Sequence, residues 1–307
     1  MKLGLVGIGK IALDQHVPAI TDSADWELAA TVSRNGSVEG VSAFDDLQLM
    51  LDTRPDIRVV SLCLPPVPRF AYAMQALEAG RHVMLEKPPG ATLAESHALL
   101  AKAHEKGVSI YATWHSRQAD MVAAAKTWLS DKTLESLHIT WKEDVRRWHP
   151  GQAWIWEPGG LGVFDPGINA LSILTEILPH DIHVSAATLE VPENCQTPIA
   201  AQISFEHPQG AKVSADFDWR QEGPQTWSIE AKTPDGTLIL SDGGAKLELD
   251  GVQIGTASAL AGEYPRLYAQ MARLVGQGGV DMDLRPMTLV CDAFTLGRRL
   301  TVAPFLP

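Results

Sequence analysis

Glycines near the start of the chain have the type and spacing needed to bind a phosphate group. Gly7, Gly9 and Ala12 form a G-x-G-x-x-A pattern directly after an apolar run. The first glycine permits a tight turn, the second lets the backbone approach a pyrophosphate, and the alanine lets the following helix pack closely on the strand. The pattern predicts a dinucleotide-binding loop in which Gly7, Gly9, Lys10, Ile11 and Ala12 contact the cofactor. The alternative is an ordinary strand–helix turn.

Two polar residues indicate which dinucleotide this loop would bind. Ser33 and Arg34 follow the second apolar run, at the position where NAD-binding chains usually carry an acid against the adenine ribose. A carboxylate would repel a 2′-phosphate, whereas Arg34 can pair with it through two parallel hydrogen bonds and Ser33 can donate another. We therefore expect NADP to be preferred, with NAD as a tolerated second cofactor. The alternative for Arg34 is a solvated loop arginine.

A lysine followed by prolines marks another strand end. Glu86-Lys87-Pro88 closes the apolar run 82–86, and ligands and catalytic groups collect at the carboxyl ends of parallel strands. Packing does not explain a lysine at such a place, and the prolines fix the local backbone. We therefore expect Lys87 to be catalytic, and we expect Pro65, Glu86 and Lys87 to contact the cofactor.

Tryptophans and charged side chains gather in the segment 141–156. Four of the nine tryptophans lie there, together with two acidic residues, two arginines and a histidine. Aromatic faces against the C–H faces of a sugar ring, with polar groups for its hydroxyls, suit a carbohydrate site. The substrate-binding residues expected in this segment are Glu143, Trp148, His149 and Trp156. His115, just after the apolar run 108–113, is a further candidate, and core packing is the alternative for all of them.

The elements that must position these residues follow from the hydrophobic pattern. Apolar runs without alternation, typical of strands buried on both faces, lie at 3–7, 26–32, 57–64, 82–86 and 108–113. Helix-like segments lie between them at 45–52, 69–80 and 92–107. Thr92 with Glu95 predicts a capping box, and Gly80 and Gly107 predict helix ends. Repeated strand–helix–strand units predict an α/β Rossmann domain, a doubly wound parallel sheet, over residues 1–118.

The pattern changes after about residue 118. Strand-like segments, many of them alternating, follow at 136–145, 184–191, 199–206, 211–219, 226–233, 236–242 and 245–251. Helical patterns lie at 161–178, 261–278 and 285–300. They predict an α+β domain with a largely antiparallel open sheet over residues 119–307. We expect a C-terminal helix to pack back on the first domain, and the sheet to offer a face for a homodimer, with a monomer as the alternative.

Composition excludes several classes of function. The chain has 307 residues, 45% of them hydrophobic and 20% charged, which suffices for two globular domains. A net charge of −12 without any Lys/Arg cluster argues against nucleic acid and against an anionic membrane as partners. Cys63, Cys195 and Cys291 are far apart in the sequence and form no C-x-x-C pair, so we expect a cytoplasmic protein without a structural metal site.

The motifs are similar to those of the glucose–fructose oxidoreductase/inositol dehydrogenase/MocA family. The resemblance covers nearly the whole chain and is carried by GIGKIA at 7–12, EKP at 86–88 and GGLGVFDPGIN at 159–169. It implies that Lys87 lies beside the nicotinamide and the substrate hydroxyl, often on a cis Lys–Pro bond. It also implies two active-site groups in the motif that runs from Asp165 to Asn169, whose spacing places both on one helix face.

A narrower resemblance implies the substrate. Segments 10–20, 86–93, 143–156 and 158–174 resemble bacterial aldose 1-dehydrogenases acting on D-galactose and L-arabinose, which oxidise the anomeric hydroxyl to the lactone. The resemblance implies Asp165 as the base, with Lys87 orienting the hydroxyl or sharing in the proton transfer. Asn169 should bind substrate, because an amide does not exchange a proton at neutral pH. Since Pro166 follows it, Asp165 also fits a helix N-cap. This chemistry requires no metal.

Two other functions stay open on the sequence. One is a dehydrogenase that acts at another carbon of a polyol or sugar acid, as inositol dehydrogenases do. The other is a non-catalytic sensor of dinucleotide and sugar, against which the presence of both Lys87 and Asp165 argues. The product separates the enzymes, because oxidation at C1 gives a lactone that opens to an aldonic acid.

Overall fold

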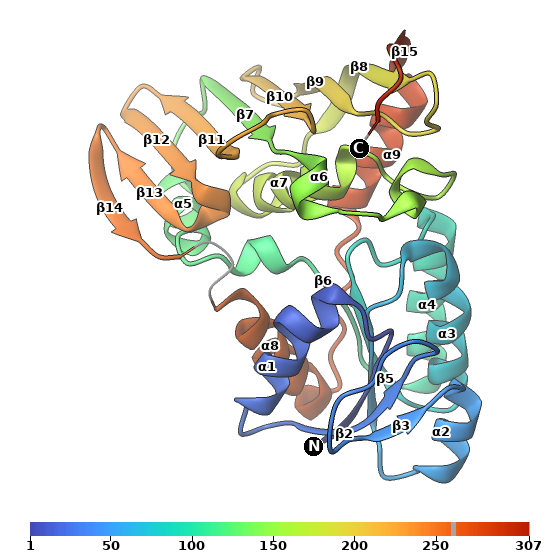
Figure 1. Ribbon diagram of the computed structural model, residues 1–307. Coiled ribbons are helices and arrows are strands. Elements are labelled where there is room, and N and C mark those ends of the chain that lie inside the picture. Colours follow the sequence, from blue (N-terminus) through green and yellow to red (C-terminus); the bar gives the residue numbers. More distant parts are fainter. Residues whose placement is uncertain (259–261, 307) are drawn as a thin grey trace. The chain divides into compact units, whose positions relative to one another are not determined.

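The computed structural model describes residues 1–258 and 262–306, which form two compact units (Figure 1). The first unit comprises Met1–His115 with Tyr264–Leu284, and the second comprises Ser116–Glu263 with Arg285–Pro307. Each unit has its own sheet. The chain therefore passes from one unit to the other three times.

The first unit contains a six-stranded parallel sheet. Its strands are β1 (Lys2–Val6), β2 (Glu27–Val32), β3 (Ser42–Phe44), β4 (Val59–Leu62), β5 (His82–Glu86) and β6 (Ile110–Thr113). They lie in the order β3-β2-β1-β4-β5-β6, and every neighbouring pair is parallel. This is the Rossmann order, in which the strand order reverses between β1 and β4 and ligands bind at the carboxyl ends of the strands. The predicted doubly wound sheet is confirmed.

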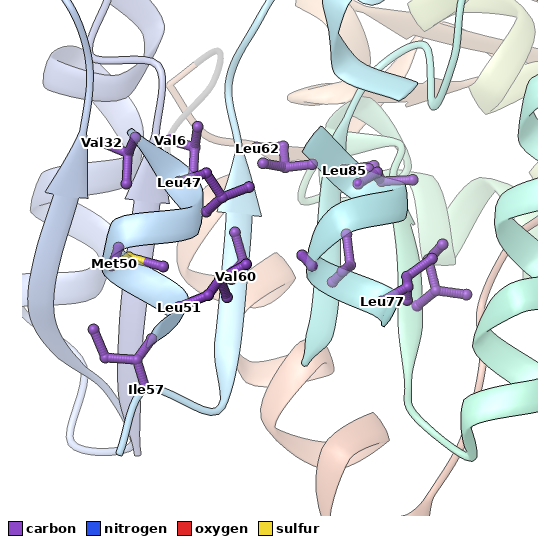
Figure 2. Close-up of a cluster of buried hydrophobic side chains, with 14 of the residues drawn as sticks. Val6, Val32, Leu47, Met50, Leu51, Ile57, Val60, Leu62, Leu77 and Leu85 are labelled. Atoms are coloured by element: carbon purple, nitrogen blue, oxygen red, sulfur yellow. The ribbon is translucent and has the colours of Figure 1, made fainter. Parts of the chain in front are cut away.

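Helices cover both faces of this sheet. On one face lie α2 (Leu47–Thr53), α3 (Pro66–Glu78) and α4 (Leu93–Lys106). Figure 2 shows apolar side chains of α2 and α3, among them Leu47 and Leu77, near Val60, Leu62 and Leu85 of the strands. On the other face lie the π-helical turn η1 (Ala12–His16), α1 (Val17–Thr21) and α8 (Glu263–Gln277). Leu267 and Met271 of α8 join Leu3 and Leu5 in one buried cluster. A segment from near the end of the chain thus completes the core of the first unit.

The predicted helix signals of this unit are present. The Thr92 side chain accepts a hydrogen bond from the Glu95 amide while the Glu95 carboxylate accepts one from the Thr92 amide, so the capping box is confirmed. Gly107 ends α4 in the left-handed conformation, and Gly80 follows α3 with a φ of 71°. Both glycines adopt backbone angles that other residues rarely tolerate.

The second unit contains a nine-stranded mixed sheet. Its strands are β7 (Ser136–Lys142), β8 (His183–Pro192), β9 (Ala200–Glu206), β10 (Lys212–Asp218), β11 (Thr226–Thr233), β12 (Gly236–Ser241), β13 (Lys246–Leu249), β14 (Val252–Thr256) and β15 (Arg298–Val302). Their order is β14-β13-β12-β11-β7-β10-β9-β8-β15. Only the pairs β7–β10 and β8–β15 are parallel, so the predicted largely antiparallel α+β sheet is confirmed.

Three helices pack on the sheet of the second unit: α5 (Val122–Leu129), α7 (Phe164–Ile177) and α9 (Arg285–Leu296). Short turns of helix complete it, namely η2 (His115–Gln118), α6 (Val145–Trp148), η3 (Ala153–Trp156) and η4 (Asp242–Gly244). Helix α7 is buried along nearly its whole length, as the apolar pattern at 161–178 predicts. Within the residues described here, no helix has the length and apolar character needed to cross a membrane.

Several expected element boundaries need correction. The helix predicted at 285–300 ends at Leu296, because Gly297 begins a turn into β15. A Cβ atom at Gly297 would clash with the backbone carbonyl oxygen of Ala293 and lie 2.9 Å from the Leu189 side chain, so glycine fits this turn best. The strand predicted at 136–145 ends at Lys142, and Ala261 of the helix predicted at 261–278 lies outside the described residues. Strands β3 and β14 and helix α5 were not among the predicted elements.

Candidate active site

The glycine loop after β1 fits a dinucleotide. Gly7 has a φ of 86°, and a Cβ atom there would lie 3.0–3.1 Å from Leu64 atoms, so this position requires glycine. At Gly9 a Cβ atom would have no heavy atom within 4 Å, which leaves the backbone accessible for close approach of a pyrophosphate. Ala12 is fully buried at the start of η1. Lys10 and Ile11 are exposed, and Lys10 forms an ion pair with Asp14.

Ser33 and Arg34 follow β2 at the same end of the sheet. The Ser33 amide donates a hydrogen bond to the Phe44 carbonyl at 2.9 Å, and the Ser33 hydroxyl accepts one from the Asn35 amide at 3.4 Å. Arg34 is exposed and, within the part of the chain that the structure describes, makes no hydrogen bond or ion pair. Its guanidinium group is therefore accessible to a ligand.

The segment around Lys87 is held from inside the first unit. The Lys87–Pro88 bond is cis, and the Lys87 amide donates a hydrogen bond to Oε2 of Glu86 at 2.9 Å. The buried guanidinium of Arg69 donates hydrogen bonds to the carbonyls of Leu64, Glu86 and Pro88. Lys87 itself is half-buried. The exposed Pro65 forms the N-cap of α3, at the end of the loop that follows β4.

The Glu86 carboxylate is buried and ionised. Its Oε1 atom accepts a hydrogen bond from the Tyr264 hydroxyl at 2.8 Å and lies 3.0 Å from Nε2 of His16. Burial by itself raises the pKa of Glu86, but the hydrogen bond and charge of His16, with smaller contributions from His115 and Lys87, lower that pKa to about 2. The His115 ring stacks on Tyr264 with ring centres 5.6 Å apart. The structure thus places His115 in the first unit, beside the network that surrounds Glu86.

In the second unit Asp165 forms a pair with His149. Val163 is the N-cap of α7, so Asp165 stands in the first turn of the helix and is not its N-cap. Its Oδ2 atom lies 3.3 Å from Nε2 of His149, and only 4% of Asp165 is exposed. The half-buried Asn169 lies one turn further along the same helix. A buried carboxylate beside an imidazole is an arrangement that can accept and hold a proton.

Aromatic rings connect the other expected substrate residues to this pair. The Trp219 ring packs on His149 and on Trp156, with ring centres 5.3 and 5.2 Å apart. The Trp219 indole donates a hydrogen bond to Oε1 of the buried Glu143 at 3.2 Å, and the Trp227 indole donates one to Oε2 at 2.8 Å. The second unit therefore brings Glu143, Trp148, His149, Trp156 and Asp165 into one network of contacts.

The tryptophans of this network differ in their polar contacts. Trp148 packs on Trp227 with ring centres 5.3 Å apart, and Trp141 stacks on the same ring. Within the described chain, the buried indole N–H groups of Trp148 and Trp141 have no hydrogen-bond partner. A buried donor without a partner costs about 1–3 kcal/mol, which a ligand hydroxyl recovers when it accepts the bond.

Several residues of these two networks were not among the predicted site residues. Trp219 directly follows β10 and Trp227 lies at the start of β11, far along the chain from the segment 141–156. Their place at the ends of alternating strand patterns is the signal that marks them. In the first unit the missed residues are His16, Arg69, Tyr264 and Tyr268. His16 carries one usable signal, since it lies four residues after the buried Ala12 and so on the same helix face. No group of three or more metal-ligating side chains is found among the described residues.

Comparisons with known proteins assign the chain to a family. The model of an oxidoreductase family with an NAD-binding Rossmann fold, named after glucose–fructose oxidoreductase, inositol dehydrogenase and MocA, matches residues 1–113. Galactose 1-dehydrogenase of Pseudomonas fluorescens is 46% identical over 305 residues, which cover 99% of this chain and 98% of that protein. This chain belongs to that oxidoreductase family. The resemblance expected from the motifs is confirmed.

Solved structures agree over the whole length of the chain. The crystal structure of D-galactose-1-dehydrogenase from Rhizobium etli superposes with a TM-score of 0.95 at 51% identity and covers 99% of this chain and 97% of that one. The structure of KijD10, a 3-ketoreductase from Actinomadura kijaniata in complex with NADP and TDP-benzene, superposes with a TM-score of 0.86 at 19% identity over 98% and 99%. At that identity the second similarity shows the shared fold alone.

Proposed function

We propose that this chain is an NAD(P)-dependent aldose 1-dehydrogenase that oxidises the anomeric hydroxyl of D-galactose or L-arabinose to the lactone. The observation that carries the proposal is the full-length similarity to D-galactose-1-dehydrogenase, at 51% identity and a TM-score of 0.95. The network of tryptophans around the Asp165–His149 pair supports a sugar as the substrate, because indole faces and polar groups together suit a pyranose.

The first unit is the proposed dinucleotide-binding part, with NADP preferred over NAD. The expected contacts of the loop are Gly7, Gly9, Lys10, Ile11 and Ala12, and those at the other strand ends are Ser33, Arg34, Pro65, Glu86 and Lys87. The exposed guanidinium of Arg34 supports the preference, because a guanidinium pairs with a 2′-phosphate and no acidic residue takes its place after β2.

The reaction separates into a hydride and a proton. A bound nicotinamide would supply the acceptor for the hydride that leaves C1 of the sugar. We assign the O1 proton to Asp165, whose partner His149 can hold the carboxylate in place or share the proton. We assign to Lys87 the stabilisation of the negative charge that develops on O1, for which a fixed cation is well suited. Neither role needs a metal.

The second unit is the proposed sugar-binding part. Asn169 would bind a sugar hydroxyl through its amide, and the unpaired indole N–H of Trp148 would donate to another. His149 and Trp156 would contact the ring. Glu143 and His115 are proposed as substrate residues from the sequence, and in the structure both hold or stack on aromatic side chains of their own unit.

A panel of aldoses with each cofactor tests the proposal. The expected result is reduction of NADP with D-galactose or L-arabinose and formation of the aldonic acid, identified by mass spectrometry. A product oxidised at another carbon would replace the proposal by the inositol dehydrogenase type of reaction. Tight NADP binding without turnover of any sugar would favour the sensor. Light scattering of the same sample distinguishes a monomer from the homodimer that the open sheet could form.

A further inference from the structure

A fully buried histidine lies behind the Lys87 segment and has no part in the reaction proposed above. His16 is the last residue of the π-helical turn η1, and none of its surface is exposed. Turns of π-helix are rare, and they occur frequently at functional sites. A fully buried imidazole needs hydrogen-bond partners for both ring nitrogens, so its surroundings show what it holds.

The partners of His16 converge on Glu86. Nε2 of His16 lies 3.0 Å from Oε1 of Glu86, and Nδ1 lies 2.7 Å from the Tyr268 hydroxyl, which in turn lies 3.3 Å from the Ser61 hydroxyl. The Tyr264 hydroxyl donates to the same Oε1 atom at 2.8 Å, and its ring packs edge-on against His16. His16 and Tyr264 therefore fix one oxygen of the carboxylate and, with it, the plane of the group.

The other oxygen of Glu86 holds the backbone of Lys87. Oε2 accepts the hydrogen bond of the Lys87 amide at 2.9 Å. From the other side, the Arg69 guanidinium donates to the carbonyls of Glu86 and Pro88. The Glu86–Lys87 peptide unit and the Pro88–Pro89 peptide unit are thus held by buried charged groups. The orientation of the Glu86 carboxylate decides whether its bond to the Lys87 amide can form.

We propose that His16 is a positioning residue for Lys87, acting through the Glu86 carboxylate and the Lys87 amide. The inference rests on the proposed function in one respect, the catalytic role of Lys87. Positioning of this kind is energetically significant, since a misplacement of about 1 Å can lower the rate of an enzyme by about 10²-fold.

The charged state of the pair agrees with this geometry. Burial by itself lowers the pKa of His16, but Cys63, Tyr268 and Glu86 beside it raise that pKa well above its ordinary value. The titratable groups around the pair are therefore Cys63 after β4, Tyr264 and Tyr268 of α8, and Lys87 and His115, which act on Glu86. A protonated His16 donates from both nitrogens, and its bond to Glu86 is charge-assisted.

Three variants and a control test the inference. His16→Leu removes the donor to Glu86, His16→Gln keeps an amide donor at that place, and Tyr264→Phe removes only the hydroxyl. His82→Leu is the matched control. His82 is a buried histidine at the start of β5, the strand that ends in Glu86, and its Nδ1 atom accepts a hydrogen bond from the Ser109 amide at 2.9 Å. We expect His16→Leu to lower kcat by about 10- to 100-fold, and His16→Gln to restore much of the loss.

Amide hydrogen exchange provides a readout that needs neither sugar nor cofactor. Pro88 and Pro89 carry no amide hydrogen, so Lys87 has the only amide between Glu86 and Gly90, and subtracting overlapping fragments resolves its exchange. We expect faster exchange of this fragment in His16→Leu and in Tyr264→Phe, and exchange at the wild-type rate in His82→Leu. If His16→Leu does not fold, the exchange rates of Tyr264→Phe and His16→Gln, compared with that of His82→Leu, decide whether the network holds the Lys87 amide.

The outcomes separate the inference from the proposed function. Slower turnover together with faster Lys87 exchange, and partial restoration by glutamine, support the inference. Equal behaviour of the His16 variants and the His82 control in both measurements overturns it. A wild-type chain that oxidises no sugar contradicts the proposed function alone, because the exchange measurement still decides whether His16 holds the lysine segment.

Discussion

Three carboxylates of the two contact networks, one in the first unit and two in the second, are buried, and each has hydrogen-bond or ionic partners inside its own unit. Glu86 is bound by the Lys87 amide and the Tyr264 hydroxyl, Glu143 by two indoles, and Asp165 lies beside His149. A buried carboxylate is costly unless such partners are present, and an apolar replacement of similar size often stabilises a protein. Removing a partner should therefore destabilise the fold, because it leaves a buried carboxylate without compensation.

Arg34 should determine cofactor choice. In Arg34→Ala the charge-assisted contact to the 2′-phosphate is lost, so we expect NADP affinity to fall by roughly 1.5–3 kcal/mol while NAD affinity stays the same. Titration of both cofactors by fluorescence measures this. Arg58→Ala is a control, since Arg58 is also exposed but lies before β4, at the opposite end of the sheet. Equal losses for NADP and NAD would assign Arg34 another role.

Asp165 and Lys87 should act in the chemical step. In Asp165→Asn the proton acceptor is removed, and in Lys87→Met the cation is removed, so we expect single-turnover NADP reduction by galactose to slow by at least about 10²-fold. The double variant should lose less than the product of the two losses, because groups that act as a unit are not additive. Asp181→Asn, an exposed aspartate paired with Arg285, should keep the wild-type rate. A near-normal rate in Asp165→Asn would move the base role to Lys87 or to water.

The lowered pKa of Glu86 predicts a loss of stability in acid. Because this pKa falls from 4.5 to about 2 on folding, the ionised carboxylate stabilises the fold above about pH 4.5, and that contribution is lost as the pH falls toward 2. A shift of this size corresponds to about 3 kcal/mol. Glu86→Gln should therefore show a weaker decline of urea stability between pH 5 and pH 3 than the wild type. Glu105→Gln, whose exposed ion pair with Lys102 contributes little, should keep the wild-type decline.

At the scale of elements, most strands and helices could be predicted from local sequence patterns. Buried strands such as β1 and β5 read as uninterrupted apolar runs, and the capping box at Thr92 fixed a helix start, so the Rossmann sheet and its glycine loop could be derived from neighbouring residues. Contacts between distant segments could not be derived from neighbouring residues. The Tyr264–Glu86 hydrogen bond joins residues 178 positions apart, and no periodicity encodes such a pairing. The positions of Gly7, Lys87 and Asp165 were thus predictable, whereas the residues that hold them were not.

Two glycines in C-terminal elements should respond in opposite ways to alanine. A Cβ atom at Gly297 would meet Leu189 at 2.9 Å between α9 and β15, so we expect Gly297→Ala to destabilise the fold by about 1–3 kcal/mol. At Gly276, inside α8, a Cβ atom would have no neighbour within 4 Å, so we expect Gly276→Ala to stabilise it by up to about 1 kcal/mol. Urea denaturation of the two variants measures both. Equal effects would show that packing around Gly297 relaxes freely.

At the scale of the whole molecule, the first unit is discontinuous in sequence. Helix α8 supplies Tyr264, Leu267, Tyr268, Met271 and Leu274 to the core that covers β1 and β4. Without it, one face of the Rossmann sheet would expose large apolar side chains to water. The stability of the dinucleotide-binding part therefore depends on residues that follow most of the second unit along the chain.

A fragment of residues 1–118 should not fold by itself. It lacks α8, so we expect it to aggregate or to bind NADP much more weakly than the full chain, because Leu3, Leu5 and Met84 would lose their cover. Fusing residues 262–284 to this fragment through a flexible linker should restore solubility and binding. Gel filtration and NADP titration measure both. A monodisperse 1–118 fragment with the affinity of the full chain would show that α8 is dispensable.

Because α8 lies late in the sequence, the ribosome synthesises it well after the strands that it covers. His115 leaves the ribosome long before Tyr264, and at roughly 5–20 residues per second the interval lasts on the order of 10 s. During this interval the six strands are complete, but the part of their sheet that α8 covers in the folded chain has no permanent cover. The nascent chain is then most exposed to aggregation and most in need of a chaperone. Slow codons placed between the two segments would lengthen that period, and the yield of soluble protein would fall with it.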